Sequence, residues 1–101
     1  MDETIEPVNF NASQELIDHM DTMFDRLVRY NDQIVKADIY LKSLRETPER
    51  AKKVEVRIFL PGGKDIFVEY EADTFKTAAQ KNYDRLKVIL TKEKEKLKSH
   101  H

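Results

Sequence analysis

The stretch DTFKTAAQKNYDRLKVILTKEKEKLK, residues 73–98, decides the fold of this chain. Read as one helix, it carries the apolar residues Phe75, Ala79, Tyr83, Leu86, Leu90 and Leu97. Successive steps of three, four or seven residues keep them on a single helix face. A helix with one apolar face needs a surface to cover it, so we expect the rest of the chain to provide that surface.

A second amphipathic helix is expected earlier in the chain. Either Asn11 or Ser13 caps the free amide groups of its first turn, and the helix runs to about Tyr30. Its apolar stripe comprises Leu16, Met20, Met23, Phe24, Leu27 and Tyr30. The two helices therefore have matching faces with which to cover a sheet.

Four segments alternate between apolar and polar residues, as half-buried strands do. They span residues 4–10, 34–44, 54–60 and 66–71. Pro7 cannot donate a ladder hydrogen bond, so it predicts a sheet edge or a bulge, and the Pro61-Gly62-Gly63-Lys64 stretch predicts a turn. The order β-α-β-β-β-α predicts an α+β two-layer sandwich, a four-stranded sheet with two helices packed on one face.

Length and composition narrow the class of protein. A chain of 101 residues fits one domain, which we expect to span residues 1–101 with an ordered core from about 4 to 98. Cysteine is absent, so disulfides, thiol nucleophiles and zinc–thiolate sites are excluded, which suits a cytoplasmic protein. No apolar run approaches the roughly 20 residues of a membrane span, and we expect no membrane contact.

The net charge is -1, but acidic and basic residues are distributed unevenly along the sequence. Residues 1–33 hold eight acidic and two basic residues, whereas residues 74–98 hold eight basic and three acidic ones. Local potential rather than net charge steers a polyanion to a surface. The C-terminal helix is therefore the expected positive pole and the first candidate for a nucleic-acid contact.

On a helical wheel centred on Leu86, the basic residues of this helix separate into two flanks. One flank holds Lys81, Arg85, Lys92 and Lys96, and the other holds Lys76, Lys87, Lys94 and Lys98. Arg26 and Arg29 share one flank of the first helix. If the helices pack side by side, these arginines and one flank of the second helix form a groove wall that neutralises phosphates.

The alternative to a phosphate-binding surface is a solvent-exposed helix face whose charges form ion pairs with one another. Pairs three residues apart are available as Asp84–Lys87, Glu93–Lys96 and Glu95–Lys98. Three acids do not pair eight bases one to one, so a surplus of positive charge remains in either interpretation.

Tyr40, Phe59 and Phe67 are predicted to lie on the sheet face opposite the core. Aromatic rings there stack on bases, form a cross-strand cluster or contact another protein. The neighbouring acidic residues repel RNA, so we favour the last two interpretations.

The sequence offers no further chemistry: it has no nucleophile–base pair and no cofactor motif, and His19 lacks partners at metal-ligand spacing. Asp18, Asp21 and Asp25 are interpreted as a solvated face, and the protein as not an enzyme.

Several segments resemble the ribosome hibernation promoting factor family, also called ribosome-associated inhibitor A or sigma-modulation proteins. They are VNFNASQELIDHMDTMFDRLVRYNDQIVKADIYLK, an alternating hairpin around PGG, and DTFKTAAQKNYDRLK. The resemblance covers the chain from about Ile5 to Lys98, and it implies a double-stranded-RNA-binding-domain-like fold. It also implies a short form of the family or an isolated N-terminal domain, in either case without the C-terminal domain that pairs ribosomes.

The resemblance implies a translation inhibitor that binds small-subunit rRNA in the decoding channel during stress or stationary phase. Its partner is the small ribosomal subunit, and no cofactor is implied. By position in the family, Arg26, Arg29, Arg85 and Lys92 fall on the family's basic positions, whereas Val88 and Ile89 stand where many members have Arg and Gln. Together with the wheel, this gives the expected rRNA-binding set Arg26, Arg29, Lys81, Arg85, Lys92 and Lys96. The alternative function is a protein-interaction module that forms a weak homodimer through Tyr40, Phe59 and Phe67.

Overall fold

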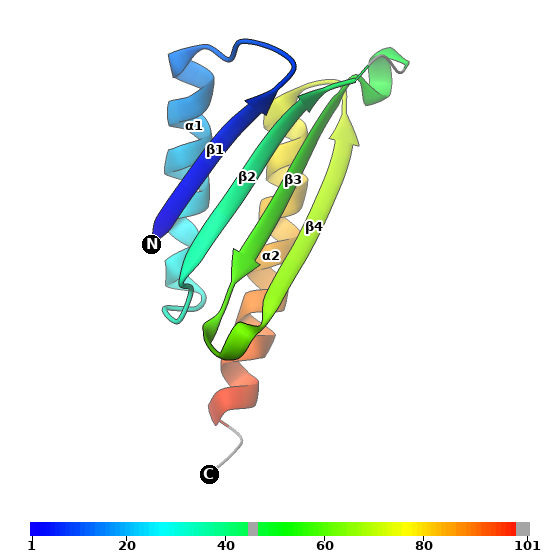
Figure 1. The fold of residues 1–101 in the computed structure, drawn as a ribbon. Coiled ribbons are helices and arrows are strands. Elements are labelled where there is room, and N and C mark those ends of the chain that lie inside the picture. The colour runs from blue at the N-terminus through cyan, green and yellow to red at the C-terminus, as the bar shows by residue number, and fades with distance from the viewer. Residues whose placement is uncertain (45–46, 99–101) are drawn as a thin grey trace.

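A four-stranded sheet is covered on one face by two helices (Figure 1). The computed structural model describes residues 1–44 and 47–98. The strands are β1 (Asp2–Val8), β2 (Lys36–Ser43), β3 (Lys52–Phe59) and β4 (Asp65–Ala72). The helices are α1 (Gln14–Asp25), which continues as the 3-10 turn η1 (Arg26–Arg29), and α2 (Phe75–Lys98). The predicted order β-α-β-β-β-α and the two-layer α+β architecture are confirmed.

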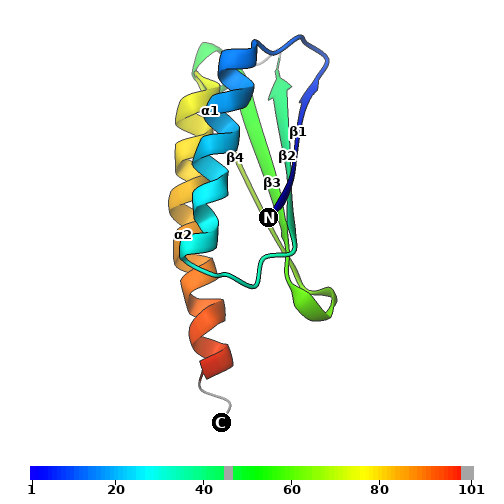
Figure 2. The ribbon, with the colours of Figure 1, turned by 90° about the vertical axis from the view of Figure 1, so that its left-hand side faces the viewer.

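The sheet has the strand order β1-β2-β3-β4, in which β1 is parallel to β2 and the other neighbours are antiparallel. The prediction that Pro7 lies at a sheet edge is confirmed, because β1 is an outer strand. Both helices lie on the same side of the sheet, and the last turns of α2 extend past its end (Figure 2). Among the described elements, none covers the outer surface of the helix layer (Figure 2).

The element boundaries follow local backbone chemistry. Ser13 caps α1, since its hydroxyl accepts a hydrogen bond from the Leu16 amide at 3.1 Å. Thr74 does the same for α2 through the Thr77 amide at 3.1 Å, so this helix begins after residue 74. β1 ends at Val8 rather than at residue 10, because Asn9 adopts a positive φ of 65° that ends the extended conformation.

The turn between β3 and β4 is confirmed, and Gly62 and Gly63 have the positive φ values, 81° and 77°, that glycine tolerates best. β2 begins at Lys36 rather than at residue 34, and Val35 is 54% exposed instead of facing the core. The predicted loop at residues 45–52 lies partly outside the described residues, and Pro48–Arg50 forms a 3-10 turn within it.

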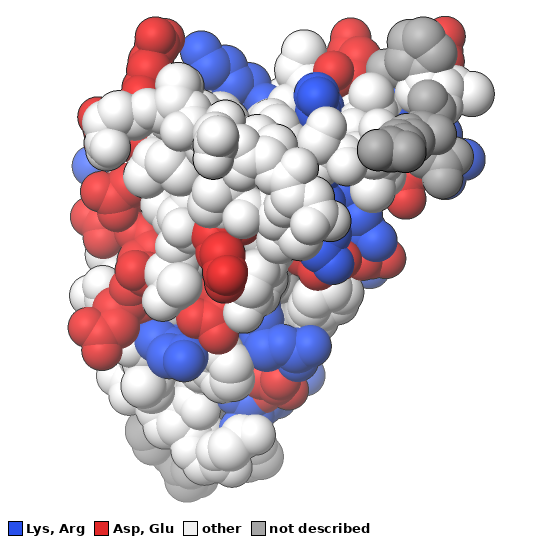
Figure 3. Space-filling view, turned by 45° about the horizontal axis from the view of Figure 1, so that its top comes forward, with Lys and Arg blue, Asp and Glu red and all other residues white. Residues whose placement is uncertain are grey.

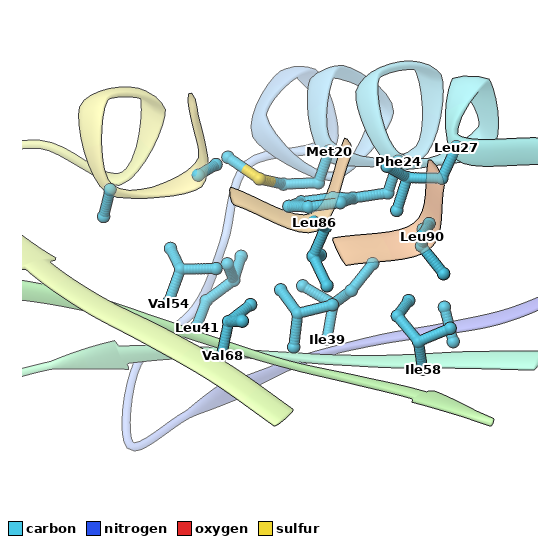
Figure 4. Packing of buried hydrophobic residues seen from close by; sticks show 14 of the residues in the cluster. Met20, Phe24, Leu27, Ile39, Leu41, Val54, Ile58, Val68, Leu86 and Leu90 are labelled. Carbon is cyan, nitrogen blue, oxygen red and sulfur yellow. The ribbon is translucent and has the colours of Figure 1, made fainter. Parts of the chain in front are cut away.

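The core lies between the sheet and the helices (Figure 4). Met20, Phe24 and Leu27 of the first predicted stripe are fully buried, as are Leu86 and Leu90 of the second. The side chain of Leu97 lies outside the described residues. The stripe on α2 is broader than predicted, because Ala78 and Asn82 are buried beside it.

Two buried asparagines tie α2 to the rest of the fold. Asn82 donates its side-chain amide to the backbone carbonyl of Val54 in β3 at 2.8 Å. Asn31, after η1, donates to the carbonyl of Leu90 at 3.2 Å and accepts from the Gln33 amide at 2.9 Å. Both residues are at most 2% exposed. An amide group without a hydrogen-bond partner at either position would therefore destabilise the folded state by its full desolvation free energy.

We expect Asn82→Ala to lower the free energy of unfolding by about 1–3 kcal/mol, because it leaves the Val54 carbonyl without its buried donor. Urea titration followed by circular dichroism measures the loss. Gln80→Ala is the control: Gln80 bonds Asp84 on the exposed surface of the same helix, and its removal should cost less than about 0.5 kcal/mol. Equal losses in the two variants would contradict a structural role for the buried amide.

Glu3 is a carboxyl group on the core side of the edge strand β1, where it pairs in register with buried Ala37. Its Oε1 atom is buried without a hydrogen-bond partner among the residues that the structure describes. Burial, a hydrogen bond with Asp21 and the charges of Asp21 and Asp25 raise the pKa of Glu3 to about 9. Glu3 is therefore protonated in the folded protein at neutral pH, although the same group ionises in the unfolded chain.

This raised pKa makes the stability of the folded protein dependent on pH. Between pH 4.5 and about 9 the unfolded state binds fewer protons at Glu3 than the folded state, so the contribution of Glu3 to stability falls as pH rises. We expect Glu3→Gln, which keeps a donor towards Asp21, to raise the free energy of unfolding at pH 7 by about 1–2 kcal/mol. The gain should vanish below pH about 4.5, where glutamate is protonated in both states.

Thermal unfolding of both proteins at several pH values from 4 to 9 measures this gain. Glu6→Gln is the matched control, since Glu6 is an exposed residue of the same strand. A gain for Glu3→Gln that is the same at pH 4 and pH 8 would show that the raised pKa is not its cause.

Candidate nucleic-acid interface

α1, η1 and α2 enclose a shallow groove on the outer surface of the helix layer. Its lining residues are His19, Thr22, Met23, Arg26, Gln80 and Tyr83, around a volume of about 270 Å³. The groove arises because the apolar faces of both helices turn down to the sheet, which leaves their polar flanks to meet above it. The side chains that border it are therefore those at the margins of the two apolar stripes.

A pair of tyrosines closes one end of this groove. The rings of Tyr30, which follows η1, and Tyr83 of α2 meet edge to face, with centroids 6.2 Å apart and an angle of 76° between their planes. Their hydroxyl groups lie 3.5 Å apart. Burial and the contact with Tyr30 raise the pKa of Tyr83, and the nearby Arg26 and Arg29 only partly oppose this. Tyr83 is thus a neutral phenol throughout the physiological range.

A second hollow, of about 440 Å³, lies beyond the tyrosine pair towards the C-terminus of α2. It is lined by Tyr30, Lys87, Val88, Thr91, Lys92 and Glu95. The ammonium group of Lys87 lies over the Tyr30 ring, 5.9 Å from its centroid. An aromatic ring, an apolar side chain and two lysines therefore share one exposed depression.

The structure places Arg26 and Arg29 beside the flank of α2 that holds Tyr83 and Lys87. Lys81 and Arg85 are exposed on the other flank of α2, away from α1. Lys92 borders the second hollow, and Lys96 donates to Glu93 at 3.2 Å beneath the overhanging end of α2. The six residues of the expected rRNA-binding set thus do not form one wall, and Lys87 joins the arginines in place of Lys81 and Arg85. Their part in RNA binding remains a prediction.

One signal in the sequence identifies the flank that meets the first helix. Tyr83 belongs to the predicted apolar stripe but lies at its margin, on the side of Lys87 rather than of Arg85. Tyr30 stands at the end of the other stripe and also carries a hydroxyl group. Two amphipathic side chains at stripe margins indicate a contact that is half buried and half exposed.

Among the residues that the structure describes, most cations of the helix layer have no acidic partner. Within residues 1–44 and 47–98 no ion pair is recorded for Arg26, Arg29, Lys81, Arg85, Lys87 or Lys92. Of the predicted pairs, Glu93–Lys96 is confirmed, whereas Asp84 accepts from Gln80 at 2.9 Å. Glu95–Lys98 falls on a side chain outside the described residues. Glu93 also binds Lys64 at 2.5 Å, so this acid is already shared by two lysines.

The outer face of the sheet is different, because its charges pair with one another. Lys42 and Lys53 both bind Glu55, at 3.0 and 3.3 Å, and Arg57 binds Asp65 at 2.5 Å. The three predicted aromatic residues, Tyr40, Phe59 and Phe67, lie on this face. Lys36 covers the Phe59 ring and Arg57 covers the Phe67 ring, each at 4.9 Å. This face therefore presents cation–π contacts and ion pairs rather than an aromatic cluster.

Acidic side chains gather on the side of the molecule that carries β1 and α1, at the left in Figure 3. Asp18, Asp21 and Asp25 are exposed there as predicted, although Asp21 and Asp25 also act on the pKa of Glu3. No group of three or more His, Asp or Glu side chains within the described chain has a geometry that holds a metal ion. Among the helices that the structure describes, none combines the length and hydropathy needed to span a bilayer.

Fold and surface together define a small α+β protein whose helix layer carries unpaired positive charge. Residues 4–98 match the family described as sigma 54 modulation protein / S30EA ribosomal protein, and the chain belongs to this family. The resemblance predicted from the sequence is thereby confirmed.

Two solved structures share the fold. One is the N-terminal domain of Thermus thermophilus Protein Y, with a TM-score of 0.77 and 22% identity over 91% of this chain and 98% of that one. The other is a ribosomal subunit interface protein from Coxiella burnetii, with a TM-score of 0.79 and 20% identity over 94% and 99% of the two chains. No curated protein matches the chain.

The two flanks of α2 are distinguished by paired charge reversals. We expect Arg26→Glu with Arg29→Glu to weaken binding to small ribosomal subunits more than Lys81→Glu with Arg85→Glu does. Arg26 lines the groove and Arg29 lies near Tyr83, whereas Lys81 and Arg85 do neither. The first change should lower the slope of log K against log salt by about 2, one for each phosphate contact removed. Both variants change the net charge equally, so a larger loss for Lys81 and Arg85 would place the interface on the other flank.

Proposed function

We propose that this protein is a ribosome-associated translation inhibitor that binds small-subunit rRNA in the decoding channel. The observation that carries the proposal is the family match over residues 4–98. The family description names ribosomal proteins, and one solved structure of the same fold is a ribosomal subunit interface protein. In this proposal the protein acts in the cytoplasm, without a cofactor and without catalysis.

The charges on the helix layer support an RNA ligand. Arg26 lines the groove, Lys87 and Lys92 line the neighbouring hollow, and Arg29 lies near Tyr83 between them. None of these four cations has an acidic partner among the described residues. Basic side chains that neutralise phosphates release condensed counterions, and this release supplies much of the affinity for nucleic acids. Free cations at a concave surface are what such binding requires, whereas paired cations must first give up their partners.

The mechanism is steric occupation. A folded rRNA helix presents its phosphates and 2′-hydroxyls across the shallow groove, so basic side chains on a rigid helix pair read its shape rather than its sequence. A domain held in the decoding channel in this way keeps messenger and transfer RNA out. Ribosomes filled with the protein are then inactive and preserved, which fits a role in stress or stationary phase.

The alternative function, homodimerisation through the outer sheet face, has one observation in its favour, the 45% exposure of Phe67. The cations of this face already cover the aromatic rings or pair with acids. A dimer there would bury those charges, and that desolvation is costly. Light scattering of the wild type and of Phe67→Asp tests this alternative. A wild-type protein that is monomeric in solution would refute it.

Sedimentation with purified small subunits tests the main proposal. We expect the protein to co-sediment at 50 mM salt and to lose affinity roughly 100-fold by 200 mM salt, the fall that four phosphate contacts produce. Large subunits serve as the control and should bind less. Absence of the protein from the small-subunit pellet at 50 mM salt would refute the proposal.

A further inference from the structure

We propose that the hollow beside Tyr30 holds a single unstacked RNA base, which stacks on the Tyr30 ring between η1 and α2. This inference rests on the proposed function and names the recognition mode of the same surface. It adds Tyr30 and Val88 as contact residues that the charge pattern alone did not indicate, and it gives Lys87 a second role beside the ring.

The first support is the shape of the hollow. It measures about 440 Å³, and Tyr30 borders it together with Val88 and Thr91 of α2. Val88 is 49% exposed, so an apolar side chain stands free next to an aromatic ring. Nucleobases have apolar faces and polar edges, and they bind between such surfaces with their edges turned to solvent.

The second support is the way in which Tyr30 is held. Tyr83 meets it edge to face with 6.2 Å between centroids, and the two hydroxyl groups lie 3.5 Å apart. Tyr83 itself packs against the core cluster, and Asn31, the next residue after Tyr30, is tied to the Leu90 carbonyl. A ring fixed in this way loses little conformational freedom when a base stacks on it.

The third support is the cover over the ring. The ammonium group of Lys87 lies over the Tyr30 ring, 5.9 Å from its centroid. Lys87 is exposed and carries a flexible side chain, so it can leave the ring for a phosphate as a base enters. Lys92 borders the same hollow, and the carboxylate of Glu95 on its rim can accept a hydrogen bond from the amino group of a base.

The charges decide between a base and a protein side chain as the occupant. An apolar side chain of a partner protein also fits an apolar hollow. That partner would then have to place acidic groups next to Lys87, Lys92 and the adjacent Arg29. A nucleotide brings its phosphates with its base and therefore matches both the ring and the cations.

The test compares Tyr30→Leu, which keeps an apolar side chain, with the wild type. Stacking on one aromatic ring contributes roughly five- to over a hundredfold in affinity, and it releases no counterions. We therefore expect Tyr30→Leu to bind small subunits, and rRNA extracted from them, at least fivefold more weakly while the slope of log K against log salt stays unchanged. Lys92→Ala should instead lower the slope by about 0.7–0.9. Tyr40→Leu on the sheet face is the matched control and should bind as the wild type does.

A gain of signal provides the second measurement and guards against misfolding. The chain has no tryptophan, so Tyr30→Trp creates one reporter at the platform. We expect this variant to keep its affinity and its fluorescence to be quenched by a single-stranded oligoribonucleotide, but not by an abasic strand of the same length. Quenching that is equal with the abasic strand would overturn the inference.

The outcomes separate this inference from the proposed function. If the wild type and Tyr30→Leu bind small subunits equally well, the stacking site is overturned but the proposed function is not. A Tyr30→Leu variant that loses small subunits but keeps extracted rRNA would show that the hollow docks a ribosomal protein, which also overturns it. Wild-type protein that fails to bind small subunits refutes the proposed function itself.

Discussion

The position of α2 on the sheet is the constraint on which the rest of the structure depends. Ala78 and Ala79 are fully buried, and their small side chains let the helix backbone approach β3 and β4 closely. The Asn82 amide then bonds a strand carbonyl, a contact that permits only one rotation of the helix about its axis. That rotation turns Tyr83 and Lys87 towards α1 and Arg85 away from it, so a buried hydrogen bond determines which cations share a surface.

The same rotation separates two kinds of charged surface. On the outer sheet face, cross-strand neighbours bring Lys53 within reach of both Glu55 and Glu69, and the charges neutralise one another. On the helix layer, the two signs of charge are unevenly distributed: α1 carries acidic residues and no Lys or Arg, whereas α2 carries more basic than acidic residues. Among the described residues, cations without an acidic partner therefore gather on the helix layer, although the chain as a whole has a net charge of -1.

Periodicity predicted the architecture, because the residues that a two-layer sandwich buries are those that repeat on one helix face or one strand face. Leu86, Leu90 and Phe24 are examples. It did not predict Asn82, since a polar residue on an apolar face carries no periodic signal until its acceptor, Val54, is known. Nor did it predict which flank of α2 meets α1. The tyrosines at the margins of the two stripes, Tyr30 and Tyr83, indicate that flank only when they are read as a pair, and they lie 53 positions apart in the sequence.

The Val88-Ile89 step shows how tertiary packing changes the meaning of a departure from a family pattern. Many members are expected to have Arg and Gln there, so from the sequence the step reduces the positive charge of α2. In the structure the two residues differ in role: Ile89 is partly buried against the core, whereas Val88 is exposed at the rim of the Tyr30 hollow. Apolar surface beside a ring and two lysines favours the flat face of a base over a phosphate. In the proposed function, the departure replaces one mode of RNA contact with another, and the phosphates are left to Arg26, Arg29, Lys87 and Lys92.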